Sequence, residues 1–144
     1  MTPTFIRSAD DFQNAVKLGV TRESETLEFK QKVDTWDARS GTDQKTRQRA
    51  QKEVCRDISQ FANTWGGCLV IGVEEDNSDD THRLKVAKAI APISNVDGLL
   101  QWIENAIRNY VVPATFTYNL IPIALPEGPI LVVNIPASLH LVSL

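Results

Sequence analysis

Two stretches of the chain place apolar residues at the spacing of an amphipathic helix. The first begins after Asp43, which can cap it, and is expected to end near residues 63–65. Its apolar positions are Ala50, Val54, Ile58 and Phe61. The second begins near Ser94 and Asp97, which resemble a capping box, and Pro113 ends it. Its apolar positions are Val96, Leu100, Ile103, Ile107 and Tyr110. We therefore expect two long helices, each with one side in the core.

Four shorter segments have the pattern of strands. Residues 25–30 alternate polar with apolar and should bury Leu27 and Phe29 on one face. Residues 68–73 are apolar throughout, which is typical of a strand buried on both faces, and the two glycines before them permit a tight turn. Residues 116–125 and 130–135 indicate two more strands, joined by a turn that contains proline and glycine.

The remaining segments predict a short helix and two loops. Ser8 can cap a helix that Gly19 ends. Residues 33–42 and 74–80 are polar and are expected to be loops, whereas the pattern of residues 84–93 does not decide between helix and strand. Helices and strands in this mixture predict an α+β domain.

The size and the apolar content indicate one domain over residues 1–144. A chain of 144 residues with 42% hydrophobic residues can build a single core. The sequence stops directly after an apolar strand, so we expect it to be the N-terminal part of a longer protein. No segment resembles a signal peptide or a membrane span, and a cytoplasmic location is expected.

The charge balance limits how the chain could meet a polyanion. Its formal net charge is −3, which is not that of a protein that coats nucleic acid without specificity. Any phosphate-binding surface must therefore be local. One candidate is a row of basic residues on the first long helix, where Lys45, Arg49, Lys52 and Arg56 fall into one stripe, with Arg47 and Lys30 nearby. Such a stripe could follow a phosphate backbone, and the alternative is a solvated helix face.

A group of acids around the first strand is a second candidate. Glu23, Glu25 and Glu28 are followed by Lys30. Many nucleases use such a pattern, in which carboxylates hold a divalent ion and the lysine stabilises charge on a phosphate. The alternative is an exposed strand face that carries charge.

Three separated blocks of sequence occur together in one known family. The blocks are residues 23–30 with Leu-Glu-Phe-Lys, residues 58–67 with Phe-Ala-Asn-Thr-Trp-Gly-Gly, and residues 69–76 with Ile-Gly-Val. In this order and spacing they resemble the Schlafen AlbA domain. The resemblance covers nearly the whole chain. It implies an α+β fold with a small mixed sheet packed with helices, and a role in binding DNA or RNA.

The same resemblance implies further expectations about context and chemistry. In bacteria such domains commonly precede an ATPase-like or winged-helix part, in proteins described as transcriptional regulators, helicase-related or ATP-binding. Animal Schlafens cleave transfer and ribosomal RNA with three acids around a divalent ion. Glu23 and Glu28 match the first two acids, and Glu75 falls where the third, usually an aspartate, stands. Lys30 would then stabilise charge, with Mg²⁺ or Mn²⁺ as the cofactor.

Four functions therefore stay open at the level of sequence. The leading one is a binding module that contacts nucleic-acid phosphates through the basic stripe. The second is a metal-dependent endoribonuclease. The third is an ATP-binding domain, although no glycine-rich loop with a lysine at phosphate-binding spacing is present. The fourth is a domain that pairs with a second copy of itself through a sheet edge within residues 116–135.

Overall fold

The computed structural model describes residues 2–33, 44–76, 85–113 and 115–144. It confirms the expected α+β fold. The helices are α1 (Ala9–Ala15), α2 (Gln44–Ala62) and α3 (Val96–Tyr110). A mixed sheet has the strand order β1-β2-β6-β5, formed by β1 (Leu27–Lys30), β2 (Gly66–Ile71), β6 (Gly128–Pro136) and β5 (Asn119–Leu125). A two-stranded sheet consists of β3 (Val73–Asp76) and β4 (Val86–Ile90).

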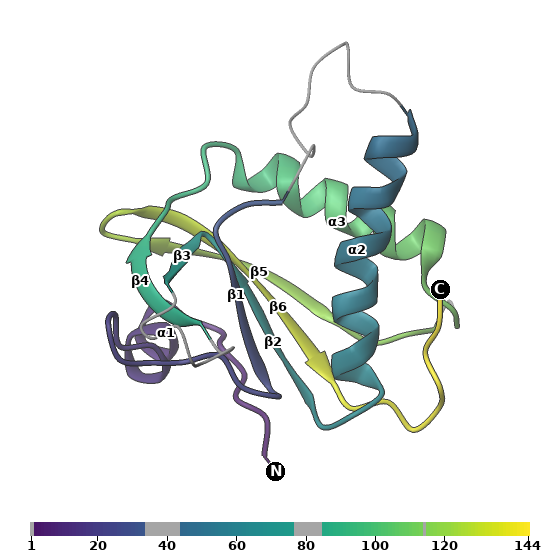
Figure 1. The fold of residues 1–144 in the computed structure, drawn as a ribbon, viewed down its shortest axis with the longest axis horizontal. Helices are drawn as coiled ribbons and strands as arrows, with labels where there is room; N and C mark the ends of the chain where they lie inside the picture. Colours follow the sequence, from purple (N-terminus) through teal and green to yellow (C-terminus); the bar gives the residue numbers. More distant parts are fainter. Residues whose placement is uncertain (1, 34–43, 77–84, 114) are drawn as a thin grey trace.

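The four-stranded sheet separates two apolar layers, because alternate residues of each strand point to opposite faces. Helices α2 and α3 cross on one face (Figure 1) and pack on alternate side chains of β2 and β6, such as Leu69 and Val133. Helix α1 packs on the other face with Phe29, Val70 and Val132. In β1 the buried residues are Leu27 and Phe29, as the alternating pattern predicted. The intervening Glu28 and Lys30 therefore point to the α2 side.

The helix boundaries follow from local capping, with one correction. The Ser8 hydroxyl accepts a hydrogen bond from the Asp11 amide at 3.1 Å and begins α1. Helix α3 begins one residue later than Ser94 suggested, because the side chain of Asn95 is the cap and accepts from the Gly98 amide at 3.0 Å. The expected cap of α2 at Asp43 lies outside the described residues.

The expectation that residues 74–80 form a loop is wrong for the part of that segment that the structure describes. The apolar strand breaks at Gly72, whose φ of +110° suits glycine, and the chain continues as β3. There Glu74 and Glu75 pair with Ala89 and Ala87 of β4. Acidic residues can occupy this strand because two lysines in and directly before β4 neutralise them. Lys88 pairs with Glu74, and Lys85 pairs with Glu75.

Two asparagine side chains fix the terminal segments to the core. Asn134 of β6 accepts from the Ile6 amide at 3.1 Å and donates to the Ile6 carbonyl at 2.9 Å, and both residues are buried. At the other end, Asn63 donates to the Val142 carbonyl at 2.7 Å and accepts from its amide at 2.8 Å. Each side chain thus imitates the paired hydrogen bonds of a neighbouring strand.

The outer strands decide where a partner could pair with the sheet. Of the two strands within residues 116–135, only β5 lies at an edge, and β6 is internal. Pro122 lies in the middle of β5 and has no amide to donate.

Among the described residues, no helix combines the length and the apolar character that crossing a bilayer requires.

Candidate nucleic-acid interface and acidic cleft

An acidic cleft of about 520 Å³ lies between β1 and the second half of α2. It exists because β1 turns its polar face toward α2, and the parallel pairing with β2 sets Glu28 beside Leu69 and Lys30 beside Ile71. The cleft has an apolar floor and a charged rim. It is lined by Glu23, Ser24, Glu25, Leu27, Glu28, Asp57, Gln60, Phe61 and Thr64.

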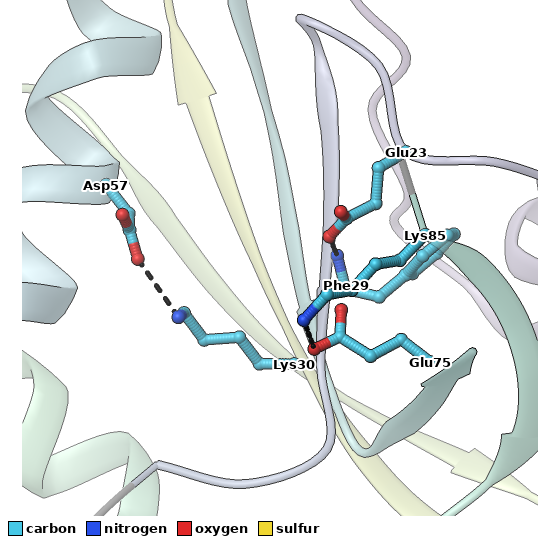
Figure 2. Close-up of polar contacts among 6 residues, drawn as sticks. All are labelled: Glu23, Phe29, Lys30, Asp57, Glu75 and Lys85. Atoms are coloured by element: carbon cyan, nitrogen blue, oxygen red, sulfur yellow. Dashed lines mark hydrogen bonds and ion pairs between the residues drawn. The ribbon is translucent and has the colours of Figure 1, made fainter. Parts of the chain in front are cut away.

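Lys30 is held in an ion pair by a residue that the sequence analysis did not single out. Its Nζ lies 3.2 Å from Oδ2 of Asp57 on α2 (Figure 2), and both side chains are about one fifth exposed, at 21% and 19%. Burial alone lowers the pKa of the Lys30 ammonium, but the carboxylates of Asp57 and Glu28 outweigh it and raise that pKa. Asp57, which lines the cleft, therefore fixes the position of the lysine beside it.

A sequence signal for Asp57 did exist. It lies three residues after Val54 and four before Phe61, which places an acid at the border of the apolar stripe of α2. An acid at such a border is partly buried and needs a cation.

The outer acids each have a local partner. Oε2 of Glu23 accepts a hydrogen bond from the Phe29 amide of β1 at 2.9 Å, and Oε1 of Glu75 lies 3.1 Å from Nζ of Lys85 (Figure 2). Glu23 is itself positioned by its own amide, which donates to the Lys85 carbonyl at 2.8 Å. The structure thus brings the predicted acids Glu23, Glu28 and Glu75 to one region. Of these, Glu23 is engaged by the Phe29 amide and Glu75 by Lys85.

The acids of this region repel one another. Burial raises the pKa of the Glu28 carboxyl to about 7, and the charge of Asp57 adds to the increase, followed by those of Glu23 and Glu75. Burial also raises the pKa of Glu23, against the lowering effect of its hydrogen bond from Phe29. The Glu28 carboxyl therefore holds its proton to a higher pH than an exposed glutamate does.

Replacing Glu28 with glutamine is expected to stabilise the domain above neutral pH. The folded state binds the Glu28 proton more tightly than the unfolded chain, whose pKa is near 4.5. The stability that this tighter proton binding adds to the folded state is fully present below pH 4.5 and is lost as pH rises through about 7. Since the carboxyl is partly solvated, the gain for Glu28→Gln at high pH is on the order of 1 to 2 kcal/mol.

Urea denaturation at acidic and at mildly alkaline pH measures this gain. The gain in free energy of unfolding should be close to zero at acidic pH, where Glu28 carries its proton in both the folded and the unfolded state. A gain of the same size at both pH values would contradict the assignment of the raised pKa to Glu28. Glu25→Gln, at a neighbouring exposed position, is the matched control.

The fit of a divalent ion to these acids is incomplete. Among the described residues, no group of three or more histidine, cysteine, aspartate or glutamate side chains is placed to hold a metal ion. Glu75 is neutralised by Lys85, and one oxygen of Glu23 is engaged by Phe29. As positioned, the three predicted ligands Glu23, Glu28 and Glu75 do not form a coordination sphere.

The predicted basic stripe lies on a different side of α2. Its four exposed residues line one shallow depression of about 290 Å³, together with Gln48. These residues, which we call the basic stripe, are Lys45, Arg49, Lys52 and Arg56. Within the described part of the chain, none of them takes part in an ion pair. Lys52 instead places its ammonium 5.6 Å from the ring centroid of Tyr110 on α3.

The basic stripe and the acidic cleft are neighbours rather than one surface. Arg56 and Asp57 are consecutive in α2, so their side chains diverge by about 100° around the helix. Arg47 is exposed but lies two residues before Arg49, about 200° away from it, and so points away from the stripe. Lys30 is instead paired with Asp57, which lines the cleft. The structure therefore groups four of the six predicted phosphate contacts and separates Arg47 and Lys30 from them.

Residues 23–143 match the family described as Schlafen, AlbA_2. This range covers β1 to β6, the cleft and the stripe. The chain belongs to the Schlafen AlbA_2 family. Among curated proteins, no match to this chain was found.

Solved structures support the fold of this Schlafen AlbA_2 domain. It is similar to the N-terminal domain of a protein from Nitrosomonas europaea that is named as related to the ATP-dependent DNA helicase RecG. The TM-score is 0.59 at 18% identity, over 92% of this chain and 74% of that one. It is also similar to the DIP2311 protein from Corynebacterium diphtheriae, with a TM-score of 0.51 at 15% identity. That match covers 94% of this chain and 22% of the other, so this chain spans under a quarter of its length.

The double glycine of this Schlafen AlbA_2 domain has a packing role. Gly66 has a φ of +80°, and a Cβ there would lie 2.7 Å from the Ala137 nitrogen. A Cβ at Gly67 would overlap the Phe61 ring and would lie 2.8 Å from the Thr26 carbonyl oxygen. Close approach of α2, β1 and the C-terminal segment therefore requires both glycines, and they give no separate support to the ATP-binding alternative.

Proposed function

We propose that this chain is a nucleic-acid-binding domain that contacts backbone phosphates through the basic stripe. The observation that carries the proposal is the unneutralised charge of that stripe. Its members lie three or four residues apart, a spacing at which like charges on a helix repel. An acidic chain with a net charge of −3 nevertheless keeps them together and exposed. Phosphates of a polynucleotide would relieve this repulsion.

Family and neighbour support the same proposal. The family resemblance implies a role in binding DNA or RNA, and the Nitrosomonas europaea protein is named for its relation to a DNA helicase. Charge on a helix face contacts phosphates and carries no base code, so DNA and RNA are both candidate ligands. A role in a transcriptional regulator or a helicase-related protein is the context that we propose for the domain.

Fluorescence anisotropy with labelled DNA and RNA, each single-stranded and duplex, tests the proposal at low salt. Four phosphate contacts predict a slope of log affinity against log salt of roughly −3 to −4. The double variant Arg49→Glu/Arg56→Glu is expected to bind at least about tenfold more weakly, with a slope reduced by roughly two. Both side chains are exposed, so the variant should fold.

A matched control separates a local contact from the effect of total charge. Arg7→Glu/Lys17→Glu makes the same change in net charge at exposed positions flanking α1, on the other side of the sheet from α2. This control should bind like the wild-type protein once the change in net charge is screened by salt. If neither polymer binds at low salt, or if both double variants weaken binding equally, the basic stripe is not the interface.

Metal-dependent RNA cleavage is the second candidate, with Mg²⁺ or Mn²⁺ as cofactor. The observation that favours it is the grouping of partly buried acids in one region: burial raises the pKa of Glu28 to about 7, the charges of Asp57, Glu23 and Glu75 add to the increase, and a divalent cation would offset both effects. Glu23, Glu28 and Glu75 are the proposed ligands, and they would have to rearrange. Cleavage of structured RNA in Mn²⁺ that persists in Glu28→Ala would exclude this ligand set.

A further inference from the structure

We propose that the preferred ligand of the basic stripe is a single strand of nucleic acid, with one base resting on the ring of Tyr110. This inference rests on the proposed function and specifies the class of ligand. Tyr110 ends α3 and is partly exposed at its border with α2. The Lys52 ammonium lies 5.6 Å from its ring centroid, so the ring adjoins the stripe directly.

The contact between Lys52 and Tyr110 can be exchanged for a contact with a nucleotide. An exposed cation–π contact is weaker than the stacking of a base on an aromatic ring. Lys52 can turn from the ring to a phosphate while the base takes the face of the ring. Within the described residues no hydrogen bond holds the Tyr110 side chain, which packs on the apolar core beneath it.

The two flanks of the stripe differ in charge, and this difference directs the strand toward Tyr110. Glu53 and Asp57 form a row on the side of α2 that faces β1, where both act on the charge of Lys30. A phosphate chain is repelled from that flank. On the opposite flank, Lys52 reaches α3 and the aromatic ring. Phosphates on the stripe would therefore place their bases on the α3 side.

The shape of the surface disfavours a duplex. The major groove of B-DNA is about 12 Å wide and admits one α-helix. Helix α3 crosses α2 (Figure 1), and Lys52 lies where the end of α3 meets α2, because its ammonium contacts the Tyr110 ring. In a duplex the faces of the bases are covered by the neighbouring base pairs, so none can rest on the Tyr110 ring, whereas the unstacked bases of a flexible single strand can.

Three labelled ligands of equal length test the inference on the wild-type protein. They are a thymidine single strand, an abasic strand with the same phosphates, and the thymidine–adenosine duplex. We expect the thymidine strand to bind at least about fivefold more tightly than either of the others, since stacking of a base adds to the phosphate contacts. Equal affinity for the thymidine and abasic strands would overturn the inference without any variant.

Variants of the ring provide the second part of the test. Tyr110→Leu should lose at least about fivefold in affinity for the thymidine strand and keep its affinity for the abasic strand, whereas Tyr110→Phe should bind like the wild-type protein. Trp65→Leu is the control, because Trp65 is a half-exposed aromatic residue beyond the end of α2. Equal effects of Tyr110→Leu and Trp65→Leu would also overturn the inference. If the wild-type protein binds through the stripe but binds the thymidine and abasic strands equally, only the inference fails. If the wild-type protein binds none of the three ligands, the proposed function itself is refuted.

Discussion

Gly66→Ala is expected to destabilise the domain by about 2 to 5 kcal/mol. The φ of +80° places any other residue in the left-handed region, which costs about 1 to 2 kcal/mol. The new methyl group would also lie 2.7 Å from the Ala137 nitrogen and 2.8 Å from the Ile135 carbonyl oxygen. Both are backbone atoms, so the strand must move, and overpacking of this kind costs about 1 to 3 kcal/mol more. Chemical denaturation followed by circular dichroism measures the loss.

Gly19→Ala is the matched control for the steric part of this loss. Gly19 has nearly the same φ, +82°, but nothing lies within 4 Å of an added Cβ. We expect it to cost only the conformational part, about 1 to 2 kcal/mol. If the two variants were equally stable, the close approach of residues 135–137 to Gly66 would not contribute, and the double glycine would need an explanation other than packing.

Asn134→Leu is expected to lower the free energy of unfolding by about 2 to 6 kcal/mol. Leucine is similar in size but makes no hydrogen bond, so the buried amide and carbonyl of Ile6 would both lose their partner. Each buried backbone group without a partner costs about 1 to 3 kcal/mol. The terminal segment should then detach, so hydrogen exchange at the Ile6 amide is expected to accelerate more than exchange in the centre of β6.

Asn63→Leu provides the comparison for Asn134→Leu. Asn63 makes the same pair of hydrogen bonds to Val142, but its side chain is exposed, and water can replace the lost contacts. The expected cost is about 1 kcal/mol. Unchanged protection of Ile6 in Asn134→Leu, or a larger loss for Asn63→Leu, would show that burial does not set the strength of these two contacts.

Local periodicity was sufficient for the elements that carry an unambiguous pattern. The apolar positions of α2 and α3 repeat at helical spacing, and Leu27 and Phe29 alternate in β1, so their burial could be predicted. Glu74 to Asp76 were wrongly expected to form a loop because the acids mask the strand pattern. Their strand depends on ion pairs with Lys88 of β4 and with Lys85, the residue before β4. A local sequence pattern cannot show such pairing between separate segments.

Part of the candidate site was predictable as a set of residues, but Asp57 and the arrangement of the site were not. Helical spacing correctly placed Lys45, Arg49, Lys52 and Arg56 on one side of α2. Helical spacing separates Arg56 from its neighbour Asp57, but it could not show that Asp57 meets Lys30, because that depends on how α2 packs against β1. The ion pair between Asp57 and Lys30 joins residues 27 positions apart, and only the packed fold brings them together.

The hydrogen bond from Phe29 to Glu23 has a consequence for how molecules of this chain meet one another. Strand β1 lies at the edge of its sheet, where an amide without a partner can pair with a strand of a second molecule. The Glu23 carboxylate already occupies the Phe29 amide and adds negative charge beside it. An incoming backbone would have to displace that acid, so the same residue that shapes the cleft also protects the domain against aggregation through β1.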